Sequence, residues 1–259
     1  MRAAKAATPL VVTLGILAAV TSCGGGSGSA SKSPTPSPAA LELQQRAAAS
    51  RYSQFTATYG ATAGTQTATI SVWFRNASTY RVDIVQNGIT ASFFGTPTGT
   101  VACSIAAGLA PACFLVAETG KPIPAAYDAG VERVFTRDLP ALATSVQAFS
   151  VAPKESIDVQ GPLPAARCYA IAAQRGSNLF TSGLLDDVDL GTYCLSDSGP
   201  PRRLDFTSGS LTLQTAGPAP SDADLTPPAA ATPLPSPSTS PSASPSPPFG
   251  LLGSAAPQA

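Results

Sequence analysis

The chain has 259 residues, of which 44% are hydrophobic, and its 15 Lys and Arg balance its 15 Asp and Glu, so the formal net charge is zero. It contains no histidine, which excludes Ser-His-Asp and Cys-His catalysis, histidine metal ligation and a histidine pH switch. No basic face of the kind that nucleic acid requires is evident in this neutral sequence. We therefore expect no nucleic-acid partner, no cofactor, no metal and no catalytic residue.

The first 22 residues have the pattern of an export signal. Arg2 and Lys5 precede an apolar run over residues 9–20, which is shorter than the roughly 20 apolar residues of a membrane-spanning helix. The sequence Val20-Thr21-Ser22-Cys23 resembles the lipobox of bacterial lipoproteins. This resemblance implies a signal peptide over residues 1–22, acylation of Cys23 with chains such as palmitate, and anchoring at the outer face of the cytoplasmic membrane. An ordinary secretory signal cleaved nearby is the alternative.

Composition divides the rest of the chain into three parts. Residues 23–40 are rich in Gly and Ser and then in Pro and Ser, which buries too little apolar surface to fold and predicts a tether. Residues 217–259 are mostly Pro, Ser, Thr and Ala, which predicts a disordered tail. One folded domain is expected between them, over residues 41–216.

The first half of this domain predicts a helix followed by antiparallel strands. Residues 41–51 are good helix formers. Apolar and polar residues then alternate, as in strands with one buried face, and Asn87-Gly88 is the strongest signal for a two-residue hairpin turn. The expected strands cover residues 52–59, 65–75, 79–86, 89–95, 100–105 and 112–117.

A helical insert is expected between Tyr127 and Val146, where apolar residues recur at helical spacing. Asp138 precedes Leu139-Pro140 and has the position of an N-cap, which favours two short helices over one long one. Glu132, Asp138 and Glu155 form no recognisable carboxylate pair for acid–base catalysis. Strand character returns over residues 157–159, 166–172, 192–195, 202–206 and 210–213.

Besides Cys23, the chain has an even number of cysteines, at positions 103, 113, 168 and 194. In an exported protein such cysteines are normally paired as disulfides. They allow three connectivities, and we favour Cys103 with Cys113 and Cys168 with Cys194 because each pair lies within one local segment. A zinc site is the weaker alternative, since no closely spaced Cys-x-x-Cys pair is present.

The order of these elements, together with short motifs, resembles the lipoprotein carriers of the LolA and LppX/LprG families. The Phe-x-Ala-x-Tyr strand at residues 55–59 is part of this order. Arg167-Cys168-Tyr169 and Tyr193-Cys194-Leu195-Ser196 resemble segments of exported lipoproteins from high-GC Gram-positive, actinobacterial-type bacteria. The resemblance covers most of residues 41–214. It implies an α+β fold in which a strongly curved antiparallel sheet, an incomplete β-barrel, carries a few short helices over its concave face, with an apolar cavity between them.

A cavity of this kind needs an apolar lining and no catalytic group. The predicted lining residues come from the sheet and from the helical insert; they are Phe55, Tyr59, Val72, Phe74, Tyr80, Val82, Ile84, Phe93, Val134, Phe135 and Leu142. For any one of these residues an ordinary packed core is the favoured interpretation, and the sequence alone does not separate a lined cavity from a packed interior. The leading hypothesis is a non-catalytic lipoprotein, anchored to the membrane through Cys23, that binds the acyl chains of a lipid or an acylated cargo. The alternative is a protein-interaction or sensory accessory lipoprotein of the cell envelope that carries no lipid.

Overall fold

The computed structural model describes residues 35–105, 108–124, 127–128, 130–173 and 188–234. The export signal, Cys23 and the end of the Pro-rich tail therefore lie outside the described residues. Among the described helices, none combines the length and the apolar character needed to cross a membrane.

The first helix, α1 (Pro38–Tyr52), begins inside the predicted tether and not at Leu41. Ser37 is its N-cap, because the hydroxyl oxygen accepts a hydrogen bond from the Ala40 N–H at 3.2 Å. Pro38 occupies the first turn, where its missing N–H is not needed. The helix buries one narrow apolar side through Leu43 and Ala47.

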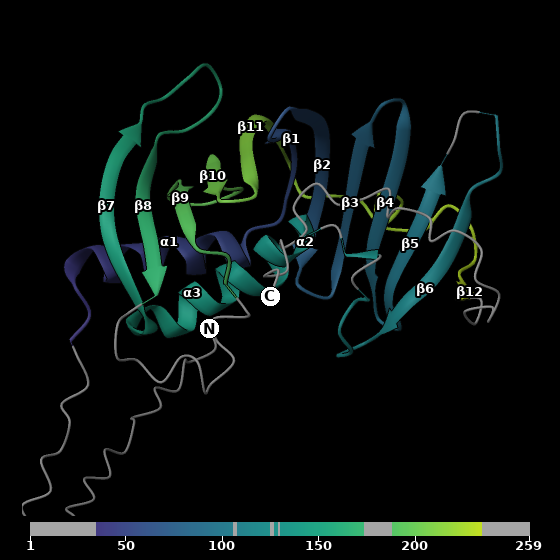
Figure 1. The fold of residues 1–259 in the computed structure, drawn as a ribbon, viewed down its shortest axis with the longest axis horizontal. Helices are drawn as coiled ribbons and strands as arrows, with labels where there is room; N and C mark the ends of the chain where they lie inside the picture. The colour runs from purple at the N-terminus through teal and green to yellow at the C-terminus, as the bar shows by residue number, and fades with distance from the viewer. Residues whose placement is uncertain (1–34, 106–107, 125–126, 129, 174–187, 235–259) are drawn as a thin grey trace, which may run out of the picture. The chain divides into compact units, whose positions relative to one another are not determined.

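A 12-stranded sheet follows, and it confirms the predicted α+β fold class with a mainly antiparallel sheet. The strand order is β12-β6-β5-β4-β3-β2-β1-β11-β10-β9-β8-β7, so the described sheet is open. Helix α1 lies with the later helix α3 (Leu139–Ser145) at the β7–β9 end of the sheet (Figure 1). Among the described strand pairs, β12 with β6 is the parallel one. The strands are β1 (Phe55–Ala63), β2 (Gln66–Asn76), β3 (Thr79–Gln86), β4 (Ile89–Thr96), β5 (Gly99–Ile105), β6 (Ala112–Glu118), β7 (Phe149–Ile157), β8 (Ala166–Ala173), β9 (Gly191–Leu195), β10 (Arg203–Phe206), β11 (Gly209–Gly217) and β12 (Thr232–Pro233).

The hairpin predicted at Asn87-Gly88 is confirmed. Asn87 and Gly88 have φ angles of 52° and 78°, as a turn with two left-handed central residues requires. Gln86 pairs with Ile89 directly beside the turn. The turn sets the register in which Tyr80, Val82 and Ile84 share one face of β3.

Strand β7 is absent from the sequence-based prediction, and the strand expected at residues 157–159 is wrong except for Ile157. Two features hide β7 in the sequence. It is an edge strand whose side chains are mostly exposed, so it shows little apolar alternation. It also contains Pro153, which an edge strand tolerates because the missing N–H removes no ladder hydrogen bond.

The helical insert is one continuous run and not two separate helices. It consists of α2 (Val131–Arg133), the π-helical turn η2 (Val134–Asp138), α3 (Leu139–Ser145) and the 3-10 turn η3 (Val146–Ala148). Asp138 is itself helical and makes no capping hydrogen bond, so its predicted N-cap role is wrong. Pro140 has no N–H for the helical ladder, and the wider π turn before it lets the chain pass the proline without stopping.

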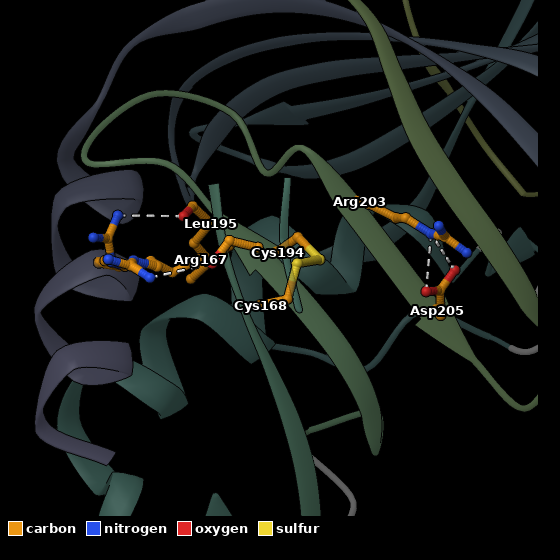
Figure 2. Close-up of a disulfide and its surroundings, with 8 residues drawn as sticks. Arg167, Cys168, Cys194, Leu195, Arg203 and Asp205 are labelled. Carbon is orange, nitrogen blue, oxygen red and sulfur yellow. Dashed lines mark hydrogen bonds and ion pairs between the residues drawn. A yellow bond between two sulfur atoms is a disulfide. The ribbon is translucent and has the colours of Figure 1, made fainter. Parts of the chain in front are cut away.

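Both predicted disulfides are present, each between neighbouring strands. Cys103 and Cys113 are directly opposite each other on β5 and β6. Cys168 and Cys194 are likewise paired across β8 and β9, as Figure 2 shows. Each bridge ties together two strands that are already adjacent in the sheet.

The folded chain continues past the predicted boundary at residue 216, as far as Leu234. Residues 218–234, which we call the strap, leave the end of β11 and finish as β12 beside β6, and Figure 1 shows them passing behind β3–β5. Within the strap, Pro220 and Leu225 are buried. The predicted tail is therefore wrong for residues 217–234, because a Pro- and Ala-rich segment can still be ordered by a surface that binds it.

Candidate interaction site

The predicted lining residues all belong to one hydrophobic core between the helices and the sheet. None of them is more than 5% exposed. Phe135 is at the centre of an aromatic cluster, with its ring centroid 6.0, 6.3 and 5.9 Å from those of Phe55, Tyr59 and Phe74. Phe55 and Phe74 also stack at 5.4 Å. The helical insert thus packs onto the sheet through ring contacts at the place where the carrier hypothesis puts a cavity.

Two buried carboxyl groups flank this cluster on the helical insert. Glu132 and Asp138 are each only 1% exposed. Burial, with the neighbouring Asp128 carboxylate, raises the pKa of Glu132 to about 8. Burial also raises the pKa of Asp138 to about 7, which outweighs the opposite effect of its hydrogen bond with Tyr193. Both groups are enclosed, so in this conformation no substrate reaches their oxygens.

The hydrogen bonds around Asp138 agree with a protonated carboxyl. The Tyr193 hydroxyl is 2.7 Å from an Asp138 carboxyl oxygen and 2.7 Å from the Asp189 backbone carbonyl. A hydroxyl carries one hydrogen, so it cannot donate to both oxygens. When Asp138 is protonated, it donates to Tyr193, and Tyr193 donates to Asp189. A chain without histidine therefore contains two groups that titrate near neutral pH.

The opposite, outer face of the sheet carries a second cluster, which the sequence reasoning missed. Side chains of alternate strand residues point to this face, where Trp73, Arg81 and Phe94 meet. The Arg81 guanidinium lies 4.5 Å from the Trp73 ring centroid and 5.2 Å from that of Phe94. It also donates two hydrogen bonds to the Asp83 carboxylate, at 2.8 and 2.6 Å. The cation is thus fixed between two aromatic rings by a carboxylate.

The strap is bound to this outer face through two arginines. Arg75 forms an ion pair with Asp222 at 2.7 Å and donates to the Pro220 carbonyl at 3.1 Å. Arg81 donates to the Asp224 carbonyl at 3.3 Å. These contacts join β2 and β3 to residues more than a hundred positions later in the chain, which is why periodicity could not reveal them.

A short turn shapes the strap for this contact. The Ser221 hydroxyl and backbone N–H lie 2.6 and 2.9 Å from the Asp224 carboxylate, and the Asp224 N–H points back to the Ser221 hydroxyl at 3.4 Å. This is the reciprocal pattern of a capping box. The turn places Leu225 in a buried position, 7% exposed. The Ser-x-x-Asp spacing was the one sequence signal that could have located the turn.

The strap ends by adding a strand to the edge of the sheet. Thr232 and Pro233 form β12 in parallel with Phe114 and Leu115 of β6. The Thr232 hydroxyl also donates to the Cys113 carbonyl at 3.3 Å. Ala229 packs against the outer cluster of Phe94, Val101 and the Cys103–Cys113 pair. The outer face therefore has the properties of a peptide-binding surface, with cations, aromatic rings and a strand, β6, whose edge β12 covers only in part.

The comparisons with known proteins give no family. No protein-family model matches the chain, and no curated protein matches it. Among solved structures, a crystal structure of MucB is similar at 17% identity and a TM-score of 0.46, over 73% of this chain and 62% of that one. A complex of MucA and MucB from Pseudomonas aeruginosa matches at 17% identity and a TM-score of 0.42, over 74% of this chain and 61% of that one. The chain thus spans less than two thirds of each of these two structures, and its resemblance to lipoprotein carriers stays a prediction.

Proposed function

We propose that this protein is a non-catalytic, membrane-anchored component of the cell envelope that binds another protein on its sheet and carries no lipid in its interior. The observation that carries the proposal is the packed aromatic core. A side chain lining a void wide enough for an acyl chain keeps surface that water can touch, whereas the predicted lining residues are at most 5% exposed. Their ring contacts leave the sheet surface as the place for binding.

Two further features support a surface function. The two disulfides tie neighbouring strands together and, in an exported protein, would resist unfolding, at about 3 kcal/mol for each closed loop. The lipobox at Cys23 would hold the domain near the membrane without any need for a lipid cargo. A rigid sheet fixed at a membrane is suited to presenting a binding face to a second protein.

Site-specific photo-crosslinking in intact envelopes tests the proposal. One variant carries a photoreactive side chain in place of Val85, which is 40% exposed on the outer face of β3. The matched variant carries it in place of Leu142, which is fully buried in the core. We expect a defined protein adduct from position 85 and only intramolecular products from position 142.

Recovery of a lipid adduct from position 142 would overturn the proposal in favour of the carrier hypothesis. Native mass spectrometry of the full chain released from membranes provides an independent measurement. We expect the mass of the acylated chain alone. A stoichiometric, non-covalently held lipid in addition to the anchor would contradict the reasoning from the packed core.

A further inference from the structure

The strap is held on the outer face by contacts that are individually weak. Asp222 is 91% exposed in its ion pair with Arg75, and exposed ion pairs add little stability. The strap buries two apolar side chains, Pro220 and Leu225, and Leu234 packs partly buried against the core. Its strand β12 has only two residues. A segment with few buried contacts opens without unfolding the domain. The strap is therefore a separable unit that lies on a preformed surface.

The surface beneath the strap contains binding groups that the strap does not contact. Strand β6 has seven residues, Ala112–Glu118, and the two residues of β12 pair with only part of it. Arg75 and Arg81 are positioned by β2 and β3, and Arg81 is fixed by Asp83 and two aromatic rings without help from the strap. A longer peptide could keep every contact of the strap and add main-chain hydrogen bonds along β6.

We propose that the outer face of β2–β6 is a peptide-binding site which the strap occupies in cis, and that an extended segment of a partner protein takes its place. The partner segment has an Asp three residues before a Leu, followed by prolines, as Asp222, Leu225 and Pro227-Pro228 are arranged here. The Asp pairs with Arg75, the Leu fills the site of Leu225, and the following residues add a strand to β6. This inference rests on the proposed surface function and gives that surface a ligand chemistry.

The strap then acts as a built-in competitor. A tethered segment has an effective concentration on the order of millimolar when its linker is short. A partner must exceed this concentration or gain affinity from additional strand pairing. The partner that binds is thus selected for a longer strand on β6, whereas short acidic peptides are excluded.

The test measures binding of a fluorescent synthetic peptide of residues 218–234 to the unaltered full chain and to two released forms, in which the strap no longer covers the outer face. The first released form carries Asp222→Ala and Leu225→Ala, which weaken the strap. In the second, a Gly/Ser linker of equal length replaces residues 218–234. Trp73 is the sole tryptophan and contacts Arg81, so its fluorescence reports whether the strap has left. We expect both released forms to bind the peptide one to one. The unaltered chain should bind it at least about tenfold more weakly, because the tethered strap competes for the same surface.

Matched variants assign the binding to the outer face. Adding Arg75→Ala to a released form should weaken peptide binding about tenfold, in the range of a hydrogen bond to a charged group. Arg203→Ala removes an arginine that is paired with Asp205 two residues later, as Arg81 is with Asp83, but on β10 (Figure 2). This control should leave peptide binding unchanged.

Several outcomes would overturn the inference. One is a released form whose Trp73 fluorescence has changed but which does not bind the peptide, and another is equal binding by the released and unaltered chains. Failure of the linker-replaced form to fold, judged by circular dichroism, would show that the strap is part of the domain and not a ligand. The crosslinking experiment tests the proposed function separately. If it yields a protein adduct and no lipid while the peptide experiment fails, the strap inference is wrong and the proposed function stands.

Discussion

Replacement of Asp138 by asparagine gives a direct test of the buried carboxyl beside Tyr193. The introduced amide is neutral, has nearly the same shape and can donate to the Tyr193 hydroxyl as the protonated carboxyl does. The hydrogen bond from Tyr193 to the Asp189 carbonyl is kept. Asp138→Asn therefore removes the titration of this site and leaves its packing and hydrogen bonds in place.

The magnitude follows from linkage between protonation and folding. Burial raises the pKa of Asp138 from its ordinary value of 3.8 to about 7 in the folded chain. The folded state therefore holds its proton more tightly, and the contribution to stability is complete below about pH 4 and is lost as the pH rises to about 7. At about 1.4 kcal/mol for each pH unit, the unaltered chain loses on the order of 2–3 kcal/mol from this site between pH 5 and pH 7.

Urea unfolding followed by circular dichroism, with the disulfides intact, measures the effect at pH 4, 5, 6, 7 and 8. We expect Asp138→Asn to be close to the unaltered chain at pH 4, and to be more stable than it by about 1.5 kcal/mol at pH 5 and on the order of 4 kcal/mol at pH 7 and 8. Glu155→Gln, which removes a charge from the exposed edge strand β7, is the matched control and should keep the original pH dependence. An equal loss of stability with pH in Asp138→Asn and in the unaltered chain would refute the reasoning.

Three further predictions concern the core, the disulfides and the strap. Phe135→Ala should lower the free energy of unfolding by about 3–5 kcal/mol, measured in urea, because it leaves a void among the aromatic rings; a loss below about 1 kcal/mol would mean that the cluster is not packed. The double variant Cys168→Ser and Cys194→Ser should lose about 3 kcal/mol in the same assay, since it frees a loop of the unfolded chain, and no loss would contradict that account. Leu225→Ala should change Trp73 fluorescence and speed proteolysis within the strap, while the circular dichroism of the sheet stays the same. Loss of the sheet's circular dichroism together with the change in Trp73 fluorescence would show that the strap does not open separately.

Much of the sheet could be predicted because its signals are local. The alternation through Ile70, Val72 and Phe74 and the turn at Asn87-Gly88 each depend on neighbouring residues, and the structure has the corresponding strands and turn. The disulfide pairs are also close in sequence, at separations of 10 and 26 residues. Such features are set by backbone geometry and by short loops, which a single sequence reveals directly.

The features that were missed depend on distant parts of the chain. Leu225 is buried on a surface that exists only after β2–β6 have formed, so the Pro- and Ala-rich composition around it gave no indication of order. Asp138 has the sequence position of an N-cap, but burial and Tyr193 keep it inside a helical turn. Pro153 argued against a strand and is tolerated because β7 is an edge. In each case a tertiary contact prevails over the local preference.

The two ends of the sheet differ in how their strand edges are protected. An exposed edge strand can pair with the edge strand of another copy, so that sheets join edge to edge and aggregate. At the β7 end, Pro153, Lys154 and Glu155 are exposed on the edge strand, and a proline beside two charges discourages a further strand. At the other end, β6 carries neither proline nor charge before its last residue and is covered instead by Thr232 and Pro233. The chain thus protects one end permanently by its composition and the other reversibly by its own strap, which would leave neighbouring copies separate while a selected partner can still be admitted.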